Sequence, residues 1–352
     1  MHISFKMNLL KKTVLFCAII FAAATTGCGK DSGTAYKTSY IMSTVVTQQL
    51  TGDKAEATAK KIESALMDFE AKTSMYKDSS YIFAINESAG KSDVEIDRST
   101  YELLKRSVEY SEKSEGLFDI TIGSLTCLWN INGENPSVPV EEDIKNARAL
   151  VDYNAVVLDE RDGKYYAAIN EKDGIVDLGG IAKGYSLDIC REILEQSDVD
   201  YGFLSVGGNV LVYGDKNTEG FNVGIREPKK DSENYFCALN LSNTIVSTTG
   251  GYERFFIEDG ITYHHVLDAR TGYPANTDLI SVSVVFENGA TADFLSTWLY
   301  IEGLDEAIKT ANENGYSVVL VDENKNVYVS EALRDSLVLP LCDTEHYTFK
   351  YI

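Results

Sequence analysis

The sequence predicts an α+β protein in which mixed or antiparallel sheets stand beside segregated helices. Amphipathic stretches with helical spacing dominate the first 150 residues and return after residue 290. Between them lie many short runs with strand-like composition, mostly joined by Gly or Asn turns. Helices and strands that come in separate runs are typical of α+β folds rather than of a regular βαβ alternation.

The first 27 residues have the pattern of a signal peptide: three lysines, a short apolar run, then Gly27 before Cys28. The apolar run is too short to span a bilayer. The Gly-Cys pair resembles the cleavage box of bacterial lipoproteins. We therefore expect residues 1–27 to be removed, residues 28–37 to form a lipidated cysteine and a flexible tether, and residues 38–352 to form a single domain. Cleavage without lipidation stays open as the alternative.

If Cys28 is lipidated, the protein is exported and anchored to the outer face of the cytoplasmic membrane. Its formal charge of −22 becomes −25 once three lysines leave with the signal peptide. This excess argues against nucleic-acid binding, which needs a basic surface. It also disfavours a bare anionic substrate unless a local cation offsets the field.

The remaining cysteines lack metal-ligand spacing and are predicted to be free thiols, although an exported protein could pair two of them.

Element by element, the first helix is predicted from an apolar stripe that includes Ala55, Ile62 and Phe69. Ser99 or Thr100 is expected to cap the second. Helices are expected at residues 50–69, 99–115, 141–150, 181–195, 291–301 and 304–314. Strands are expected at residues 155–158, 164–169, 174–178, 201–206, 209–213, 221–225, 236–241, 244–247, 255–257, 262–267, 279–286, 317–322 and 326–329.

Two distant segments indicate one oxygen-rich site. Asp293 and Thr297 are four residues apart on a predicted helix and share one face, with Ser296 beside them. Such hard oxygen donors suit Mg²⁺. The simpler interpretation is an acid that complements a helix N-terminus and a threonine that bonds to the preceding turn.

The second segment runs from Asp177 to Gly184 and contains paired glycines and Lys183. The glycines let backbone approach a bulky ligand, and the lysine places a charge where a phosphate could sit. The helix that follows starts with free N–H groups, which favour anions. Neither the P-loop nor the GxGxxG pattern occurs here. A tight turn with a solvated lysine is the simpler alternative.

Histidines and aromatic residues supply further candidates. His264 and His265 lie near Asp268 and Arg270, so one of the pair could act as a general base or could be structural. The aromatic residues considered for stacking on a planar ring are Tyr76, Phe118 and Trp129; aromatics are more often core.

Taken in order, these segments resemble the ApbE family of FAD:protein FMN transferases. The matching blocks are Met42-Ser43-Thr44, Ser74-Met75-Tyr76, Gly116-Leu117-Phe118-Asp119, Asp177 to Tyr185, Ser205 to Asn209, Thr249 to Arg254, His265 to Asp268 with Arg270-Thr271-Gly272, and Ala292-Asp293 with Thr297. They are collinear across residues 40–303.

The resemblance implies an ApbE-like, T-fold-like domain that transfers FMN from FAD to a threonine hydroxyl of a partner protein and releases AMP. The positions it implies for FAD contact are Met42, Tyr76, Leu117, Phe118, Asp119, Asp177, Lys183 and Leu267. It implies that Mg²⁺ is held at Gly180, by its backbone oxygen, and by Asp293 and Thr297. Some members have aspartate where this chain has Ser296, which puts that ligand in doubt.

For catalysis we expect Lys183 to add a cation at the phosphates and His265, or a nearby carboxylate, to take the proton of the acceptor threonine. The acceptor is expected to carry a Ser/Thr-Gly-Ala-Thr-like motif on an extracytoplasmic or membrane redox complex. Gly289-Ala290-Thr291 resembles that motif, but Thr291 is expected to cap a helix. Hydrolysis of FAD to FMN and AMP, and flavin binding without turnover, remain as alternatives.

Overall fold

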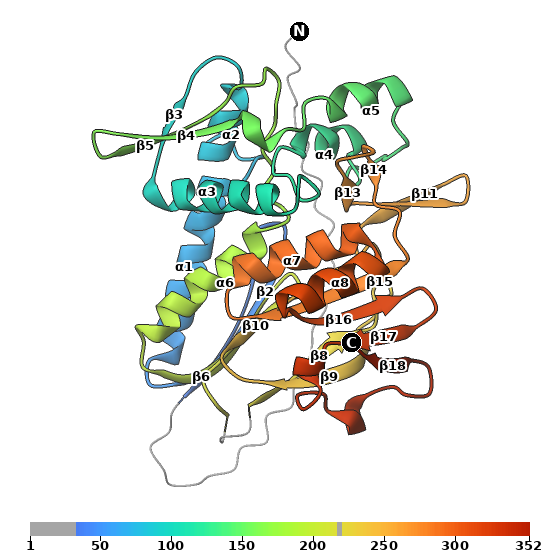
Figure 1. The fold of residues 1–352 in the computed structure, drawn as a ribbon. Helices are drawn as coiled ribbons and strands as arrows, with labels where there is room; N and C mark the ends of the chain where they lie inside the picture. Colours follow the sequence, from blue (N-terminus) through green and yellow to red (C-terminus); the bar gives the residue numbers. More distant parts are fainter. Residues whose placement is uncertain (1–32, 217–219) are drawn as a thin grey trace. The chain divides into compact units, whose positions relative to one another are not determined.

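The structure is a computed structural model that describes residues 33–216 and 220–352. The signal peptide, Cys28 and tether residues 29–32 lie outside the described residues. A nine-stranded sheet forms the centre of residues 33–352 (Figure 1). Only its last two strands pair in parallel. In spatial order its strands are β1 (Thr34–Ile41), β2 (Thr44–Gly52), β6 (Val199–Val206), β7 (Asn209–Tyr213), β10 (Thr244–Thr249), β15 (Leu279–Phe286), β16 (Ser317–Asp322), β17 (Asn326–Val329) and β18 (Thr348–Tyr351).

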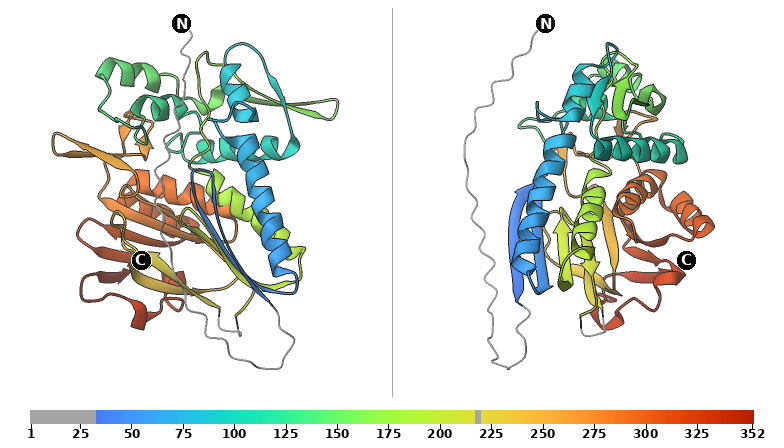
Figure 2. Two further views of the ribbon diagram at one scale, coloured as in Figure 1. Left: turned by 180° about the vertical axis from the view of Figure 1, so that it is seen from behind. Right: turned by 90° about the vertical axis from the view of Figure 1, so that its left-hand side faces the viewer.

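Four helices cover one face of this sheet. They are α1 (Ala55–Thr73), α6 (Ala182–Glu195), α7 (Gly289–Glu302) and α8 (Leu304–Asn314), each in contact with the next. Figure 2 shows in its side view that α1 lies against β1 and β2. The helices and strands therefore form two packed layers, and the α+β prediction is confirmed.

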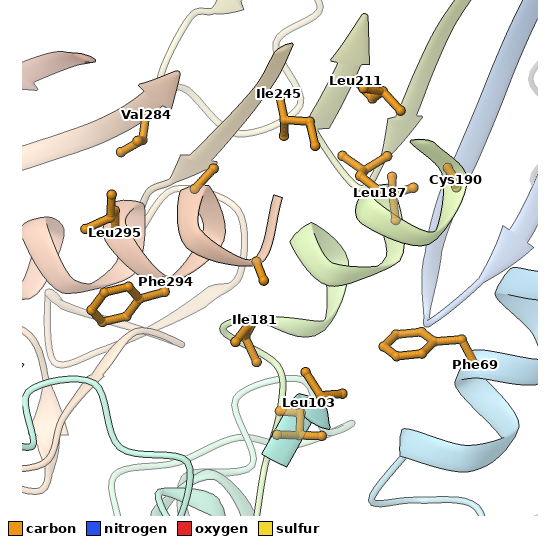
Figure 3. Packing of buried hydrophobic residues seen from close by; sticks show 14 of the residues in the cluster. Phe69, Leu103, Ile181, Leu187, Cys190, Leu211, Ile245, Val284, Phe294 and Leu295 are labelled. Atoms are coloured by element: carbon orange, nitrogen blue, oxygen red, sulfur yellow. The ribbon is translucent and has the colours of Figure 1, made fainter. Parts of the chain in front are cut away.

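The central strands are buried on both faces. Along β10, Ile245 faces the helices while Val246 belongs to a second apolar cluster on the opposite face. Leu211 and Val212 divide in the same way, because successive side chains of a strand point to opposite faces. Figure 3 shows the helix side of this core, where Leu295 and Leu187 lie toward the strands that carry Val284, Ile245 and Leu211. The far face is covered by the hairpin of β8 (Phe221–Arg226) and β9 (Tyr235–Leu241) and by residues that follow β17.

The remaining elements lie above the helical layer in Figure 1. A small sheet of order β3-β5-β4 stands beside short helices, and two hairpins complete this part. The elements are α2 (Tyr81–Glu87), β3 (Val94–Ile96), α3 (Arg98–Lys113), α4 (Gly123–Trp129), α5 (Glu141–Arg148), η1 (Tyr153–Ala155), β4 (Val156–Arg161), β5 (Lys164–Ile169), β11 (Phe255–Glu258), β12 (Ile261–His264), β13 (Leu267–Asp268) and β14 (Tyr273–Pro274).

Several expected elements need correction. Residues 34–37 of the expected tether belong to β1, and residues 50–52 of the expected first helix belong to β2. The alternation of apolar and polar residues in β1 and β2 was hard to recognise because both strands carry many polar residues. Residues 174–178 form no strand: the peptide group of Val176 pairs instead with the side-chain amide of Asn86. The expected strand 262–267 breaks after His264.

Two helix caps also differ from expectation. Asp97, rather than Ser99 or Thr100, caps α3 by accepting from the Thr100 N–H. Asn288 caps α7 by accepting from the Thr291 N–H, so Thr291 lies inside the first turn. In both cases the acceptor precedes the expected cap, and helix boundaries are the least certain part of a sequence assignment.

Helices α6 and α7 cross at two glycines. A Cβ atom on Gly184 would lie 2.0 Å from the carbonyl oxygen of Gly289 and 2.6 Å from Cβ of Asp293, closer than any side chain permits. Only glycine allows this approach. The crossing carries Lys183, at the start of α6, to the side of Asp293 on α7.

Candidate active site

The carboxylate of Asp293 lies at the centre of the site, where α6 and α7 cross. It is buried, and donors from three separate parts of the chain hold it. The Gly184 N–H donates to Oδ2 at 2.9 Å. Asn209 Nδ2 and Ser247 Oγ donate to Oδ1 at 2.9 and 3.0 Å. Ser247 Oγ also lies 2.9 Å from Asn209 Oδ1, so its single hydroxyl proton serves one of these two oxygens at a time and the two donors contact one another.

Lys183 lies beside this carboxylate at the rim. Its Nζ is 3.6 Å from Asp293 Oδ1 and 3.4 Å from the carbonyl oxygen of Gly179. The side chain is 29% exposed, so it is only partly shielded from solvent. Its stem passes the Gly207-Gly208 turn, where a Cβ atom on Gly207 would lie 3.2 Å from Lys183 Cδ. The structure therefore brings the two segments predicted to form one site into contact.

Hydroxyl groups continue the site along α7. Thr249 Oγ1, at the end of β10, lies 2.8 Å from Ser296 Oγ and 3.3 Å from Thr297 Oγ1. Gly180 adjoins the same place, because a Cβ atom there would lie 3.8 Å from Thr297 Cγ2 and 2.9 Å from the ring of Phe118. Thr249 and Ser247 were not among the sequence candidates; only strand pairing reveals them.

These donors fit a hard divalent cation such as Mg²⁺. One carboxylate, a row of hydroxyls and the Gly180 backbone converge, and all donors are oxygen. Within residues 33–216 and 220–352, no three His, Cys, Asp or Glu side chains are grouped so that they could hold a metal ion. Ser296 Oγ donates to the carbonyl oxygen of Asp293 at 3.0 Å, which engages its proton within the helix.

The turn after α3 presents backbone to the same region. The Phe118 ring is buried edge-on against Phe294, with centroids 5.2 Å apart. The Asp119 carboxylate accepts from the N–H and hydroxyl of Thr121 and from the Tyr153 N–H. Burial raises the pKa of Asp119. Its carboxylate thus holds the turn together, and Leu117 packs partly buried against the core.

Tyr76 and Asp177 lie near one another at the surface. The Tyr76 ring is 73% exposed, yet surrounding protein atoms, followed by the Asp177 carboxylate and Cys127, raise the pKa of Tyr76 to about 12. Asp177 Oδ1 accepts from the Gly179 N–H at 2.8 Å. Arg254 opposes this pKa shift through its charge and is a further cation that the candidate list missed.

The two histidines differ in their surroundings. His264 Nε2 is 3.1 Å from the Ala275 carbonyl oxygen and 3.4 Å from the Tyr300 hydroxyl, which indicates a structural role. His265 Nδ1 is buried and has no hydrogen-bond partner among the described residues. Burial, with the positive charges of Arg254 and Lys183, lowers the pKa of His265 to about 3. The imidazole is therefore neutral at ordinary pH and can accept a proton.

Three other candidates, Trp129, Leu267 and Met42, lie apart from the Asp293 carboxylate. Trp129 is buried and donates from Nε1 to the Gly272 carbonyl oxygen at 2.7 Å, so it is a core residue. Leu267 is buried in the same small apolar cluster. Met42 and Ser43 form the turn between β1 and β2 with φ of 53° and 55°, an uncommon conformation for residues other than glycine. Strain of this kind is often stored at functional sites.

Comparisons with known proteins identify the family of this chain. A model described as the ApbE family matches residues 34–320. The FAD:protein FMN transferase of Treponema pallidum (strain Nichols) is 32% identical over 297 residues, which cover 80% of this chain and 82% of the relative. The enzyme of the same name from Haemophilus influenzae is 30% identical and covers 86% and 88%.

Solved structures are similar as well. An ApbE protein of Thermotoga maritima superposes with a TM-score of 0.80 at 31% identity, covering 86% of this chain and 99% of that one. Flavin transferase ApbE from Vibrio cholerae reaches 0.77 at 21% identity, with the same coverage, and supports the fold alone.

Proposed function

Because the chain belongs to the ApbE family, we propose that it is an FAD:protein FMN transferase that moves FMN from FAD to a threonine hydroxyl of a partner protein and releases AMP. The observation that carries the proposal is the meeting of Lys183 with the carboxylate of Asp293, 3.6 Å apart, at a rim of oxygen donors. A cation beside an oxygen-rich metal site is what a pyrophosphate ester requires.

In this proposal Mg²⁺ is held by Asp293, Thr297 and the backbone oxygen of Gly180, with Ser296 adjacent. When bound, Mg²⁺ neutralises charge on the pyrophosphate of FAD and makes AMP a better leaving group. The network of Asn209 and Ser247 fixes the Asp293 carboxylate before any ligand arrives. Lys183 places its charge against the phosphate oxygens.

The flavin would lie between the Met42 turn, Tyr76 and Asp177, and the backbone of residues 117–119, with Leu267 at the margin. Tyr76 is the exposed aromatic surface in this set. The three hydrogen bonds of Asp119 hold its turn so that neighbouring peptide groups can contact a ring edge.

We assign the general base to His265. The acceptor threonine oxygen forms a bond to the phosphorus of the FMN moiety, the bond from that phosphorus to AMP breaks, and the threonine proton passes to the neutral imidazole. Burial first, and then the charges of Arg254 and Lys183, lower the pKa of His265 and make it a weak base alone; a bound phosphate would offset the part that comes from these charges.

One assay tests the activity. The protein is incubated with FAD, Mg²⁺ and a domain that carries a Ser/Thr-Gly-Ala-Thr-like motif, and both AMP and the mass of the domain are followed. The proposal requires AMP together with an adduct of FMN mass. AMP without an adduct would identify an FAD pyrophosphatase, and neither product would identify a flavin-binding protein.

The chain itself is a poor acceptor. The Thr291 hydroxyl within Gly289-Ala290-Thr291 is hydrogen-bonded to Tyr110 and Asn288 at 2.7 and 2.8 Å. The Asp188 carboxylate accepts from the N–H groups of Gly289 and Ala290. We therefore propose a separate acceptor, a subunit of an extracytoplasmic or membrane redox complex, and no adduct on the enzyme.

We also propose that Cys28 is lipidated and anchors the exported protein to the outer face of the cytoplasmic membrane. Among the described residues, no helix has the length and apolar character that crossing a bilayer requires. The test is labelling of cells with an alkyne fatty acid: the wild-type chain should be labelled and sediment with membranes. Cys28→Ala should lose both properties; labelling of that variant would contradict the proposal.

A further inference from the structure

Two of the thiols, those of Cys237 and Cys342, lie at the apolar cluster on the face of the sheet away from the helices. After β17 the chain returns antiparallel to β9, with Leu337 bridged to Leu239. Val338 N–H donates to the Ala238 carbonyl oxygen at 2.9 Å. A short 3-10 helix, η3 (Leu339–Leu341), follows and contacts β9.

One hydrogen bond joins the residues next to the two cysteines. Asp343 N–H donates to the Phe236 carbonyl oxygen at 2.8 Å. Cys342 precedes Asp343 and Cys237 follows Phe236, so an antiparallel alignment based on this bond sets the two cysteines against each other. Opposed residues of antiparallel segments have Cα atoms about 4.5–5.5 Å apart, which is within the span of a disulfide.

Both side chains also point into the same apolar cluster. Cys237 is fully buried there, and Cys342 packs against it partly buried. The Cys342 thiol donates to the Val338 carbonyl oxygen at 3.4 Å, which turns its sulfur toward the segment that faces β9. Burial, followed by the neighbouring Cys342, raises the pKa of the Cys237 thiol.

Access differs between the two sulfurs. Cys342 lines a cavity of about 640 Å³ together with Phe236, Tyr347 and Lys325. Cys237 has no exposed surface. A small reagent can therefore reach Cys342 from the cavity, while Cys237 can react only with a group already attached to its neighbour.

We propose that Cys237 and Cys342 form a disulfide that ties β9 to the C-terminal segment. The Cys342 thiolate attacks a small disulfide, forming a mixed disulfide and releasing one thiol. The Cys237 thiolate then attacks the Cys342 sulfur, forming the intramolecular bond and releasing the second thiol. The protein loses two thiol protons and two electrons, and the small disulfide is reduced to two thiols. An exported protein meets such oxidants.

The test treats the folded full-length protein with 2-hydroxyethyl disulfide, an uncharged reagent that the acidic surface does not repel. Remaining thiols are then alkylated, and the chain is digested without reduction. We expect one linked peptide pair that contains Cys237 and Cys342, with a mass about 2 Da below that of the two reduced peptides because two hydrogens leave. The melting temperature should rise by several degrees, since the bond closes a long loop.

Cys342→Ser should abolish the linked pair, whereas Cys127→Ser, which alters an exposed thiol elsewhere, should leave it unchanged. Cys342 that retains the reagent as a mixed disulfide while Cys237 is alkylated only after unfolding would overturn the proposal. So would a link from Cys342 to any other cysteine. Both of these contradicting results would be seen with the wild-type chain, so they do not depend on the folding of a variant.

Discussion

Two buried aspartates of this protein are held in opposite ways. Asp119 takes two of its hydrogen bonds from Thr121 in its own turn and one from Tyr153, 34 residues further along the chain. Asp293 takes its bonds from α6, β7 and β10, and Lys183 stands beside it. The first carboxylate stabilises a local backbone shape. The second is a preorganised oxygen donor whose position depends on the whole domain, as a metal ligand requires.

The most severe way to break the Asp293 arrangement is Gly184→Val. The new side chain would overlap the Gly289 carbonyl and Asp293, so α6 and α7 would have to separate. We expect a loss of more than about 4 kcal/mol in the free energy of unfolding, measured by urea denaturation. Gly33→Ala, where no atom lies within 4 Å of the new methyl group, is the control and should unfold like wild type.

A direct comparison uses Asp293→Asn and Asp119→Asn. The first should lower Mg²⁺-dependent FMN transfer on the order of 10²–10³-fold, the cost of removing one preorganised electrostatic contact. The second should lower the melting temperature and leave the Mg²⁺ concentration for half-maximal rate unchanged. Equal effects of both variants on that concentration would erase the distinction between the two carboxylates.

Neutral His265 makes stability depend on pH. Its pKa of about 3 in the folded protein lies below the 6.5 of an ordinary histidine, so below pH 6.5 the unfolded chain binds the proton more tightly. Stability from this group is therefore complete above pH 6.5 and is lost as the pH falls toward 3, by a few kcal/mol. Urea denaturation at pH 7 and pH 5 should show a smaller drop for His265→Gln than for wild type. An equal drop in both proteins would contradict the assignment of a neutral, buried His265.

The smallest effect is expected from Asn209→Ala, which removes one orienting donor from Asp293. Removing a group that orients a metal ligand weakens metal affinity about 10- to 100-fold. Calorimetric titration with Mg²⁺ in the presence of FAD measures this independently of turnover. Asn240→Ala, an exposed asparagine paired with Asn222, should bind Mg²⁺ like wild type; wild-type affinity in Asn209→Ala would show that Ser247 and Gly184 suffice.

Much of the architecture was predictable because helix and strand periodicity are local properties. The helix that carries Asp293 and Thr297 was expected at nearly its observed position, as were strands β6, β7, β10, β15, β16 and β17 of the central sheet, whereas β18 was not expected. β1 and β2 were missed because their outer faces carry polar and aromatic residues in place of a clean apolar alternation. The true caps Asp97 and Asn288 have the residue type that caps helices, so closer attention to the preceding residue would have identified them.

The linear pattern was enough to show that one carboxylate and one hydroxyl share a helix face, and that a lysine follows a glycine pair, because such spacing follows from the chain alone. It could not show that Asn209, Ser247 and Thr249 surround them, or that Cys342 faces Cys237. Those neighbours meet through pairing and packing between segments far apart in the chain. Contacts of that kind depend on the assembled sheet and on the glycine crossing of α6 and α7.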